Sequence, residues 1–344
     1  MVKTLKLRYY VLRRLLLSVL VLLGVCVITF VIARVVPANP AAMWVGTHPT
    51  AEQIARARKE LGLDQPLHIQ FFIYMSKLLN GDLGVSIRTH DKVLNDIASF
   101  LPASLELIGT GMLIALMVGI PLGVMSAVKK DSIIDHFSRL FSIGGVSFFV
   151  PWLGMMGQLV ISKWLGLLPI GDRIDMSVSV FHPIQTMTRF YLIDSLITGN
   201  FVAFQSVACH MILPALVMAA YPIGLVTRMT RSSMADILEE DYIRTARAYG
   251  LREITIAYRY ALKNAIGPTI TVLALSFAYS LVETFLIETV FNWPGLGRYA
   301  ALSITSLDYP AIMGIAMVVA VVYVALNLFV DLVQAYLDPR IRLK

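Results

Sequence analysis

The chain has 344 residues, of which 57% are hydrophobic and 15% are charged, with two cysteines and a formal net charge of +7. Soluble domains average about 45–50% apolar and about 25% charged residues. The composition therefore excludes a disordered chain, a disulfide-stabilised scaffold and an ordinary soluble enzyme, and it indicates a membrane protein. The positive charge would favour a nucleic-acid partner only if the basic residues formed one water-facing patch.

Six uncharged runs are long enough to cross a membrane as helices, since about 20 apolar residues span about 30 Å of hydrocarbon. They cover residues 15–33, 107–128, 140–162, 207–227, 264–282 and 311–330. We therefore expect an all-α membrane protein with six transmembrane helices. The first run holds 19 uncharged residues. A cleaved signal peptide has about 7–15 apolar residues, so we expect this run to be retained.

The distribution of lysine and arginine predicts the orientation, because cytoplasmic loops are enriched in these residues. With both termini inside, the cytoplasmic segments hold 18 of the 29 basic residues. We therefore place the N-terminus and the C-terminus in the cytoplasm of a prokaryotic cell, with the chain in the inner membrane. Topology accounts for the positive charge, so no nucleic-acid partner is expected. Cys26 and Cys209 both lie inside runs, so no structural disulfide is expected.

Two long segments are expected on the outer side. Residues 51–61 are rich in Ala, Glu, Arg and Gln, with Thr50 as a candidate N-cap and Gly62 and Pro66 as stop signals. We expect an external helical segment there, which is either a docking surface or a solvated loop without a partner. Residues 163–206 mix Gly, Pro, Asp and aromatic residues, and we expect an irregular loop near an outer mouth.

The cytoplasmic stretch at 228–263 carries a helix signal. Residues 233–236 (Ser-Met-Ala-Asp) have the form of a capping box, and we expect a helix from there to Gly250. Leu238, Tyr242, Ala246 and Tyr249 would form a narrow apolar stripe on it. Such a helix either lies on the lipid surface or fits a groove on a partner protein, and the pattern does not separate the two.

The sequence carries no signature of catalysis. It has no phosphate-binding G-x-x-x-x-G-K-[ST] loop, no set of metal ligands at a suitable spacing and no nucleophile elbow. We therefore expect a non-catalytic chain with no metal or cofactor of its own. His210 is alone in its run, and we expect it to be a packing residue.

Ionisable residues in or near the spans are the functional candidates, because a charge is costly to bury in lipid. Ser276, Ser280 and Glu283 are spaced i, i+4, i+7 and form a polar stripe that we assign to a translocation pathway. The alternative is that Glu283 reaches the outer headgroups and is solvated. We expect Glu288 at the outer interface, and Glu106 at the positive end of the second spanning helix.

Several short motifs follow one another over nearly the whole chain. They are G-L-D-Q-P at 62–66, G-D-L-G-x-S at 81–86, Pro102 with L-E-L at 105–107, V-G-I-P-L-G at 118–123, D-Y-I-R-T-A-R-A at 241–248 with Gly250, W-P-G-L-G at 293–297 and D-P-R at 338–340. Each motif is weak alone, but their order and spacing together are specific. In this respect the chain resembles a B-type permease subunit of the ABC importers for dipeptides, oligopeptides and nickel.

The resemblance implies the type I ABC importer permease fold. It also implies four partners: a second homologous permease subunit, two ATPase subunits that bind ATP and Mg, and an extracytoplasmic substrate-binding protein. We expect three parts: residues 1–101 with the first span and the external helical segment, a permease domain at 102–337 and a cytoplasmic tail at 338–344. The permease domain would include a coupling loop at about 234–263.

In this family the coupling loop sits in a cleft on the ATPase, which favours the groove over the lipid surface. The residues that match the loop are Arg244, Thr245, Ala246, Arg247, Ala248 and Gly250. Gly250 would supply a turn and Ala246 a close approach. Relatives tend to carry a small residue where Glu283 stands, so Glu283 is a candidate for cargo selectivity, for instance by attracting the amino end of a peptide.

The leading hypothesis is ATP-driven uptake of dipeptides or oligopeptides by alternating access. Nickel chelates, glutathione and oligosaccharides are the alternative cargoes within the family. A stand-alone ion-coupled secondary transporter is an alternative of another class. It would favour an internal repeat and paired ionisable groups at the midplane, and the sequence shows neither.

Overall fold

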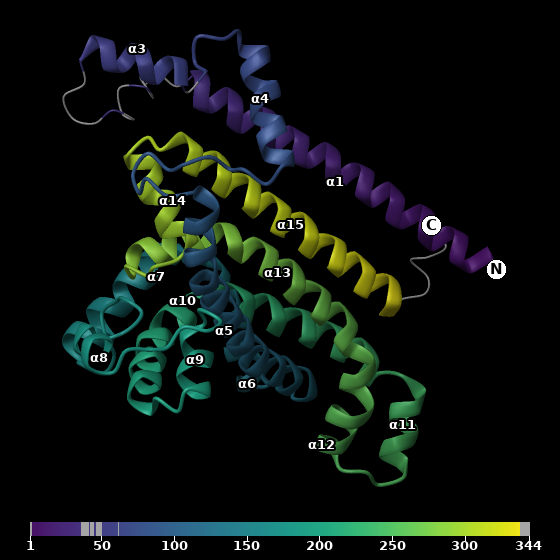
Figure 1. Ribbon diagram of the computed structural model, residues 1–344. Coiled ribbons are helices and arrows are strands. Elements are labelled where there is room, and N and C mark those ends of the chain that lie inside the picture. Colours follow the sequence, from purple (N-terminus) through teal and green to yellow (C-terminus); the bar gives the residue numbers. More distant parts are fainter. Residues whose placement is uncertain (1, 36–40, 42–44, 46–49, 61, 338–344) are drawn as a thin grey trace. The chain divides into compact units, whose positions relative to one another are not determined.

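The structure is a computed structural model that describes residues 2–35, 41, 45, 50–60 and 62–337 (Figure 1). Within these ranges every regular element is a helix, beside one isolated antiparallel bridge between Val85 and Lys92. The all-α prediction is therefore confirmed. The chain divides into two compact units, one formed by residues 1–101 and 295–325 and the other by residues 102–294 and 326–344.

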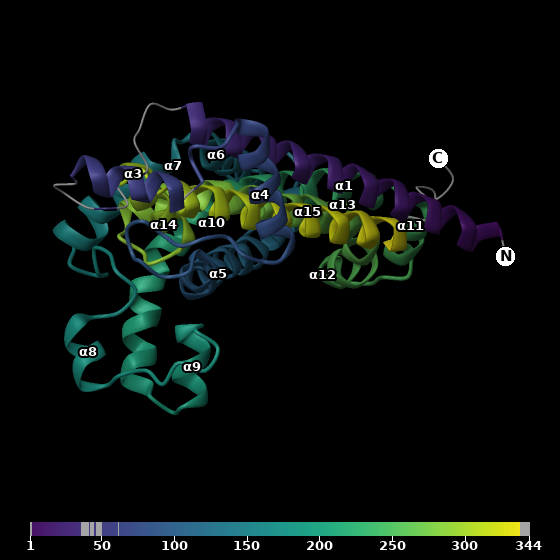
Figure 2. The same ribbon diagram turned by 45° about the horizontal axis from the view of Figure 1, so that its top comes forward.

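The elements of each unit are as follows. The first unit contains α1 (Val2–Val35), α3 (Ala51–Glu60), α4 (Leu67–Leu79) and α14 (Leu296–Thr305), and it shares α5 (Val93–Val128) and α15 (Tyr309–Leu337) with the second. The second unit contains α6 (Ile133–Ser147), α7 (Val150–Gly157), η1 (Gln158–Trp164), α8 (Met176–Phe181), α9 (Tyr191–Ile197), α10 (Phe201–Leu238), α11 (Asp241–Ala248), α12 (Glu253–Thr255), η2 (Ile256–Ala261) and α13 (Leu262–Val290). In both ribbon views α8 and α9 lie beside the beginning of α10 (Figure 2).

Five helical stretches of the described chain are long and apolar enough to cross a membrane. They are Leu12–Ala33, Val93–Val128, Phe201–Leu238, Glu253–Val290 and Tyr309–Phe329. Five of the six predicted runs each lie inside one helix. The first lies in α1, the second in α5, the fourth in α10, the fifth in α13 and the sixth in α15. These five predictions are confirmed, and the number of spans becomes six when one bent helix pair is included.

The third predicted span, residues 140–162, is not one continuous helix. α6 and the α7–η1 segment meet at a bend of 105°. Phe148 and Phe149 have extended backbones at the bend, and Pro151 follows in the first turn of α7. Proline has no N–H with which to continue the hydrogen bonds of a preceding turn, so a helix readily restarts there. An uncharged run has membrane length but does not reveal this break.

The helix predicted at 51–61 is confirmed as α3, and its ends have the expected chemistry. The Gln53 N–H donates to Thr50 Oγ1 at 3.3 Å, and the Thr50 N–H donates to Gln53 Oε1 at 2.9 Å, which is a complete capping box. Gly62 ends the helix with φ +64°. The helix α4 that follows was not predicted, and the Phe71 ring on it packs edge-on against Phe30 of α1, with 5.2 Å between ring centroids.

A buried carboxylate organises the first unit. Asp308 accepts hydrogen bonds from Ser86 Oγ at 2.5 Å, from the Arg88 N–H at 3.1 Å and from the Ala311 N–H at 3.2 Å. The last bond caps the beginning of α15. Nearby, Tyr299 donates to Asp96 at 2.8 Å, and burial, followed by this bond, raises the pKa of Tyr299 well above its ordinary value. The serine of the G-D-L-G-x-S motif therefore ties residues 81–86 to the beginning of α15.

A stripe of small residues brings α5 and α10 together in the second unit. Gly111, Gly119 and Gly123 lie on α5, and a Cβ atom at each would come within 2.6–2.8 Å of Met218, Val226 or Thr230 on α10. Ala115, also fully buried, completes the four-residue spacing. Helices in lipid associate through such close backbone approach, because lipid provides no hydrophobic driving force between them. Two of these glycines belong to the V-G-I-P-L-G motif.

Candidate functional site

The candidate coupling residues lie on one short helix, α11. The capping box predicted at residues 233–236 is wrong, because α10 continues without a break through Leu238. The chain turns at Glu239 and Glu240 instead, and Glu240 has an extended backbone. Asp241 begins α11, where its negative charge stabilises the positive helix end. The capping-box pattern also fits the interior of a longer helix, so the sequence alone did not separate the two.

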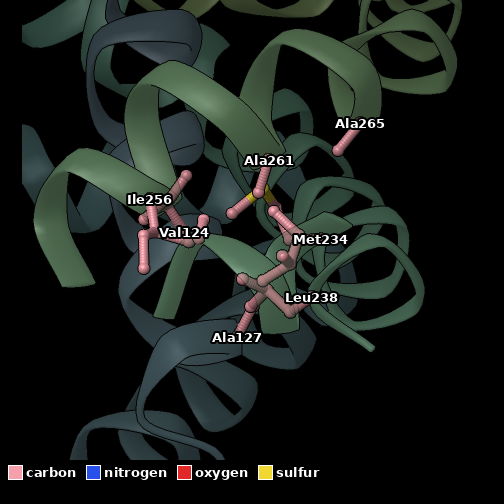
Figure 3. Close-up of a cluster of buried hydrophobic side chains, with 10 residues drawn as sticks. Val124, Ala127, Met234, Leu238, Ile256, Ala261 and Ala265 are labelled. Carbon is pink, nitrogen blue, oxygen red and sulfur yellow. The ribbon is translucent and has the colours of Figure 1, made fainter. Parts of the chain in front are cut away.

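The inner face of α11 packs on a closed apolar cluster that we call the α11 core (Figure 3). Its buried residues come from α5 (Val124, Ala127), α10 (Met234, Leu238), α11 (Ile243, Ala246), η2 (Ile256, Ala257, Ala261) and α13 (Ala265). Ala246, which we expected to allow a close approach, is buried in this core. The core connects α11 to the ends of three long helices.

The predicted apolar stripe of α11 is only partly correct. Leu238 and Ala246 are buried, but Tyr242 and Tyr249 are exposed, Tyr249 by 83%. Ile243, which the stripe omitted, is fully buried. The predicted stripe assumed one continuous helix from residue 233 to Gly250. The turn at Glu239 and Glu240 separates two helices instead, so the spacing must be counted anew from Asp241. Counted from Asp241, the i, i+3 spacing of Ile243 and Ala246 identifies the inner face.

Gly250 ends α11 in a left-handed turn with φ +73°. Its N–H donates to the Arg247 carbonyl at 2.9 Å, and the Leu251 N–H donates to the Ala246 carbonyl at 3.3 Å, which together make a Schellman motif. A Cβ atom at Gly250 would meet nothing within 4 Å. Glycine is therefore favoured here by backbone conformation, and the space outside the turn is open.

The outer face of α11 is polar and largely exposed. Arg244, Thr245 and Ala248 are exposed. Arg247 Nε donates to Glu253 Oε1 at 2.8 Å, which ties α11 to α12. This pair is about half exposed, and ion pairs of that kind contribute about 0–1 kcal/mol. Of the six candidate residues, Ala246 is therefore buried against the α11 core. The other five are exposed: Arg244, Thr245, Arg247 and Ala248 on α11, and Gly250 in the turn that follows it.

The polar stripe on α13 is divided differently from the prediction. Ser276 and Ser280 are buried inside the unit, and Ser276 Oγ donates to the Val272 carbonyl at 2.9 Å. Glu283 is half-buried, and no other described residue forms a hydrogen bond or ion pair with its carboxyl group. The two serines therefore lie on the packed side of α13, and Glu283 lies at the edge of the packed surface.

Glu288, which we expected at the outer interface, is fully buried within its unit rather than solvated. It accepts hydrogen bonds from Ser104 Oγ at 2.5 Å and from Thr284 Oγ1 at 3.1 Å. Close by, Trp293 Nε1 donates to the Ala103 carbonyl at 3.0 Å. These contacts join the end of α13 to α5. The sequence did not show them because the partners are 184 and 190 positions apart.

Glu106 does not lie at the positive end of its own helix, since α5 begins at Val93. It is buried and forms an ion pair with Arg173, at 2.5 Å between Oε2 and the guanidinium. Its other oxygen accepts the Leu192 N–H at 2.7 Å, so it stabilises the positive end of a different helix, α9. The Arg173 guanidinium lies 3.7 Å from the Tyr191 ring centroid.

The segment predicted as an irregular loop at 163–206 contains α8 and α9 and is held by Asp194. This buried carboxylate accepts the N–H groups of Met187, Thr188 and Arg189 at 2.9–3.2 Å, and the Thr188 hydroxyl at 2.6 Å. Burial alone would raise the pKa of Asp194, but these hydrogen bonds hold it below its ordinary value. The loop is therefore ordered by charge rather than by a large apolar core.

His210 and the two cysteines lie inside predicted spans. His210 is buried with Nδ1 2.8 Å from the Ser206 carbonyl, as expected of a packing residue. Cys26 and Cys209 are free thiols. Within the part of the chain that the structure describes, no group of three or more His, Cys, Asp or Glu residues could hold a metal ion. The D-P-R motif and the tail at 338–344 lie outside the described residues.

Comparison with known proteins matches two family models to the chain. Residues 119–343 match the binding-protein-dependent transport system inner membrane component, and residues 7–108 match the N-terminal part of a membrane component of such systems. The probable D,D-dipeptide transport system permease protein DdpB of Escherichia coli is 46% identical over 94% of both chains. The dipeptide transport system permease protein DppB of Alkalihalophilus pseudofirmus is 39% identical over 97% of this chain and 99% of the relative. The glutathione transport system permease protein GsiC of Salmonella paratyphi A is 36% identical over the same shares.

Proposed function

Because the chain belongs to the family of binding-protein-dependent transport system inner membrane components, we propose that it forms half of the channel of an ATP-driven importer of dipeptides and other short peptides. The family is one of multi-pass, non-catalytic permease subunits of ABC transporters. The peptide cargo is supported by the dipeptide transport systems to which the relatives at 46% and 39% identity belong. The relative named for glutathione makes that tripeptide the second candidate cargo.

We assign the coupling function to the exposed side of α11. In this proposal Arg244, Thr245, Arg247 and Ala248 contact a partner ATPase, while Ala246 and Gly250 shape the helix and its end. The observation that supports it most directly is that α11 exposes a polar face and anchors the other face in the α11 core. A movement of this helix is thereby passed to α5, α10 and α13, which share the core.

The proposed assembly contains this chain, a second homologous permease subunit, two ATPase subunits and an extracytoplasmic binding protein. ATP and Mg bind the ATPase subunits, and this chain carries no cofactor. Both termini and α11 lie in the cytoplasm, which agrees with the distribution of Lys and Arg. Residues 1–101 form the first span and an external segment, residues 102–337 the permease domain and residues 338–344 a cytoplasmic tail.

We assign Ser276, Ser280 and Glu283 to the side of α13 that borders the pathway. Glu283 is the member at the edge of the packed surface, and a carboxylate there would attract the positive amino end of a peptide. Glu283→Gln should lower uptake of dipeptides with a free amino end, and Glu239→Gln, an exposed residue at the end of α10, should not. If Glu283→Gln leaves uptake of every cargo unchanged, the assignment falls.

The test of the proposed function is uptake by proteoliposomes that contain this chain and its four proposed partner subunits. A labelled dipeptide should accumulate only with ATP inside and all components present. Glutathione and a nickel chelate, supplied under the same conditions, test the alternative cargoes. Uptake by vesicles that contain this chain alone, driven by an ion gradient, would refute the importer and favour a secondary transporter.

A further inference from the structure

A buried ion cluster joins the beginning of α6 to α5 and α10. It lies near the ends of α5 and α10 that contribute residues to the α11 core. Its centre is Asp135, which lies in the first turn of α6 and is fully buried. Arg231 of α10 donates to both of its oxygens, from Nε at 2.7 Å and from the second guanidinium nitrogen at 2.9 Å. Ser126 of α5 donates to the same carboxylate. Two parallel bonds from one guanidinium fix both distance and orientation.

A second arginine shares the carboxylate without linking helices. Arg139 lies one turn further along α6 and donates to Asp135 at 2.5 Å. Because Arg139 and Asp135 belong to the same helix, their pair neutralises charge but attaches α6 to nothing else. Arg231 is therefore the member whose ion pair holds α6 to α10.

The rest of the α6 surface explains why this pair matters. Among the α6 side chains that the structure describes, the buried ones are Asp135, Ser138 and Ser142, and a Cβ atom at Gly145 would lie 2.6 Å from the Ala220 carbonyl oxygen. Five large apolar side chains of α6 are exposed instead, namely Ile133, Phe137, Leu140, Phe141 and Ile143, while Ile134 is partly buried. A face of small residues allows close approach of two helices, but it offers few interlocking side chains to fix how far one has slid along the other.

The far end of the same bent segment contacts α13. Gln158 of η1 donates to the Val290 carbonyl at 3.1 Å, and a Cβ atom at Gly154 of α7 would lie 3.1 Å from the Phe291 ring. The α11 core contains no residue of α6 or α7. The bent segment thus reaches the end of α13 directly, and it reaches the neighbourhood of the α11 core through the Asp135 cluster.

We propose that Asp135 and Arg231 are positioning residues for transport: their ion pair fixes the register of α6 on α10, so that the bent α6–α7 segment follows the α11 core when the importer changes state. This inference rests on the proposed function of α11. The pair determines whether movement of the coupling helix reaches the outer end of α13 by this route.

The experiment compares two arginine variants in the full importer, reconstituted with its partner subunits and binding protein. Arg231→Gln removes the pair between helices, and Arg139→Gln is the matched control that removes the pair within α6. We measure dipeptide uptake and ATP hydrolysis together. Arg231→Gln should lower uptake per ATP by about tenfold, a typical size for coupling between sites, and ATP hydrolysis should continue. Arg139→Gln should leave the ratio unchanged.

Equal ratios in the two variants, or a wild-type ratio in Arg231→Gln, would overturn the proposal, because the cluster would then serve only to neutralise a buried charge. A second measurement leaves the Asp135–Arg231 ion pair intact. Spin labels on cysteines that replace the exposed residues His136 on α6 and Asp236 on α10 should keep one distance in the nucleotide-free and ATP-bound importer. A change of several ångströms between the two states would refute a fixed register. Absence of uptake by the wild-type importer would contradict the proposed function instead.

Discussion

At the scale of single residues, the backbone at Gly250 determines how α11 ends. A residue with a Cβ atom in the left-handed conformation costs about 1–2 kcal/mol, and a β-branched one costs more. We expect Gly250→Val to leave the amount of chain in the membrane unchanged and to lower peptide uptake per ATP hydrolysed. Gly267→Ala is the control, because its Cβ atom would meet nothing and its φ is negative. Normal coupling in Gly250→Val would contradict the role of this turn.

The buried pair of Glu106 and Arg173 gives a second prediction at this scale. Both side chains are 5% exposed, so removing one charge leaves the other buried without compensation. Such a loss destabilises a protein by about 3–5 kcal/mol. We expect Glu106→Gln to release the α8–α9 segment and to accelerate tryptic cleavage after Arg189. Arg56→Gln removes an exposed pair on α3 and should leave this cleavage unchanged. Equal cleavage in wild type and Glu106→Gln would show that the pair does not hold the segment.

At the scale of elements, the contact between α5 and α10 depends on the absence of side chains. A Cβ atom at Gly123 would lie 2.6 Å from Thr230 Cβ and 2.8 Å from the Thr227 carbonyl oxygen, and one of these contacts is with rigid backbone. Overpacking of this kind typically costs about 1–3 kcal/mol. We expect Gly123→Ala to lower the midpoint of thermal unfolding in detergent. Gly109→Ala, on the same helix with open space, should leave it unchanged. Equal midpoints would mean that α5 and α10 can move apart enough to accommodate the methyl group without loss of stability.

The α9 segment should lose order in acid, with Asp194 as the cause. Its pKa is lowered in the folded chain, so the stability that Asp194 contributes is complete above the ordinary aspartate pKa of about 3.9 and is lost as the pH falls toward the folded-state pKa. Hydrogen-exchange protection of the Thr188 and Arg189 amides, corrected for intrinsic rates, should be lower at about pH 3 than at about pH 6. In Asp194→Asn the protection should be the same at both values. A pH-independent wild type would refute the assignment.

At the scale of the whole molecule, the orientation in the membrane can be tested directly. In a chain without Cys26 and Cys209, single cysteines at Thr245 and at Met176 mark α11 and α8, and both positions are exposed. An impermeant maleimide should label Thr245→Cys only in inverted vesicles and Met176→Cys only in right-side-out vesicles. The reverse pattern would place α11 outside the cell and would exclude contact with an ATPase.

Hydropathy predicted most of this architecture, because a span in lipid must satisfy its backbone hydrogen bonds within itself and be apolar over its length. The features it missed depend on contacts far apart in sequence. Glu106 is paired with Arg173 and Glu288 with Ser104, and no local pattern shows whether a carboxylate at the end of an apolar run is solvated or paired. The bend at residues 148–149 was missed because phenylalanine and valine continue the apolar run through it.

The contact between Ser86 and Asp308 has a consequence for the order of synthesis. The body of the second unit, residues 102–294, is contiguous and precedes residue 295 on the ribosome. The first unit needs Asp308, which is 222 positions after Ser86. Residues 81–86 are therefore synthesised early, but their contact with Asp308 forms late. During translation, Ser86 therefore has no Asp308 to bind until the residues just before α15 have left the ribosome.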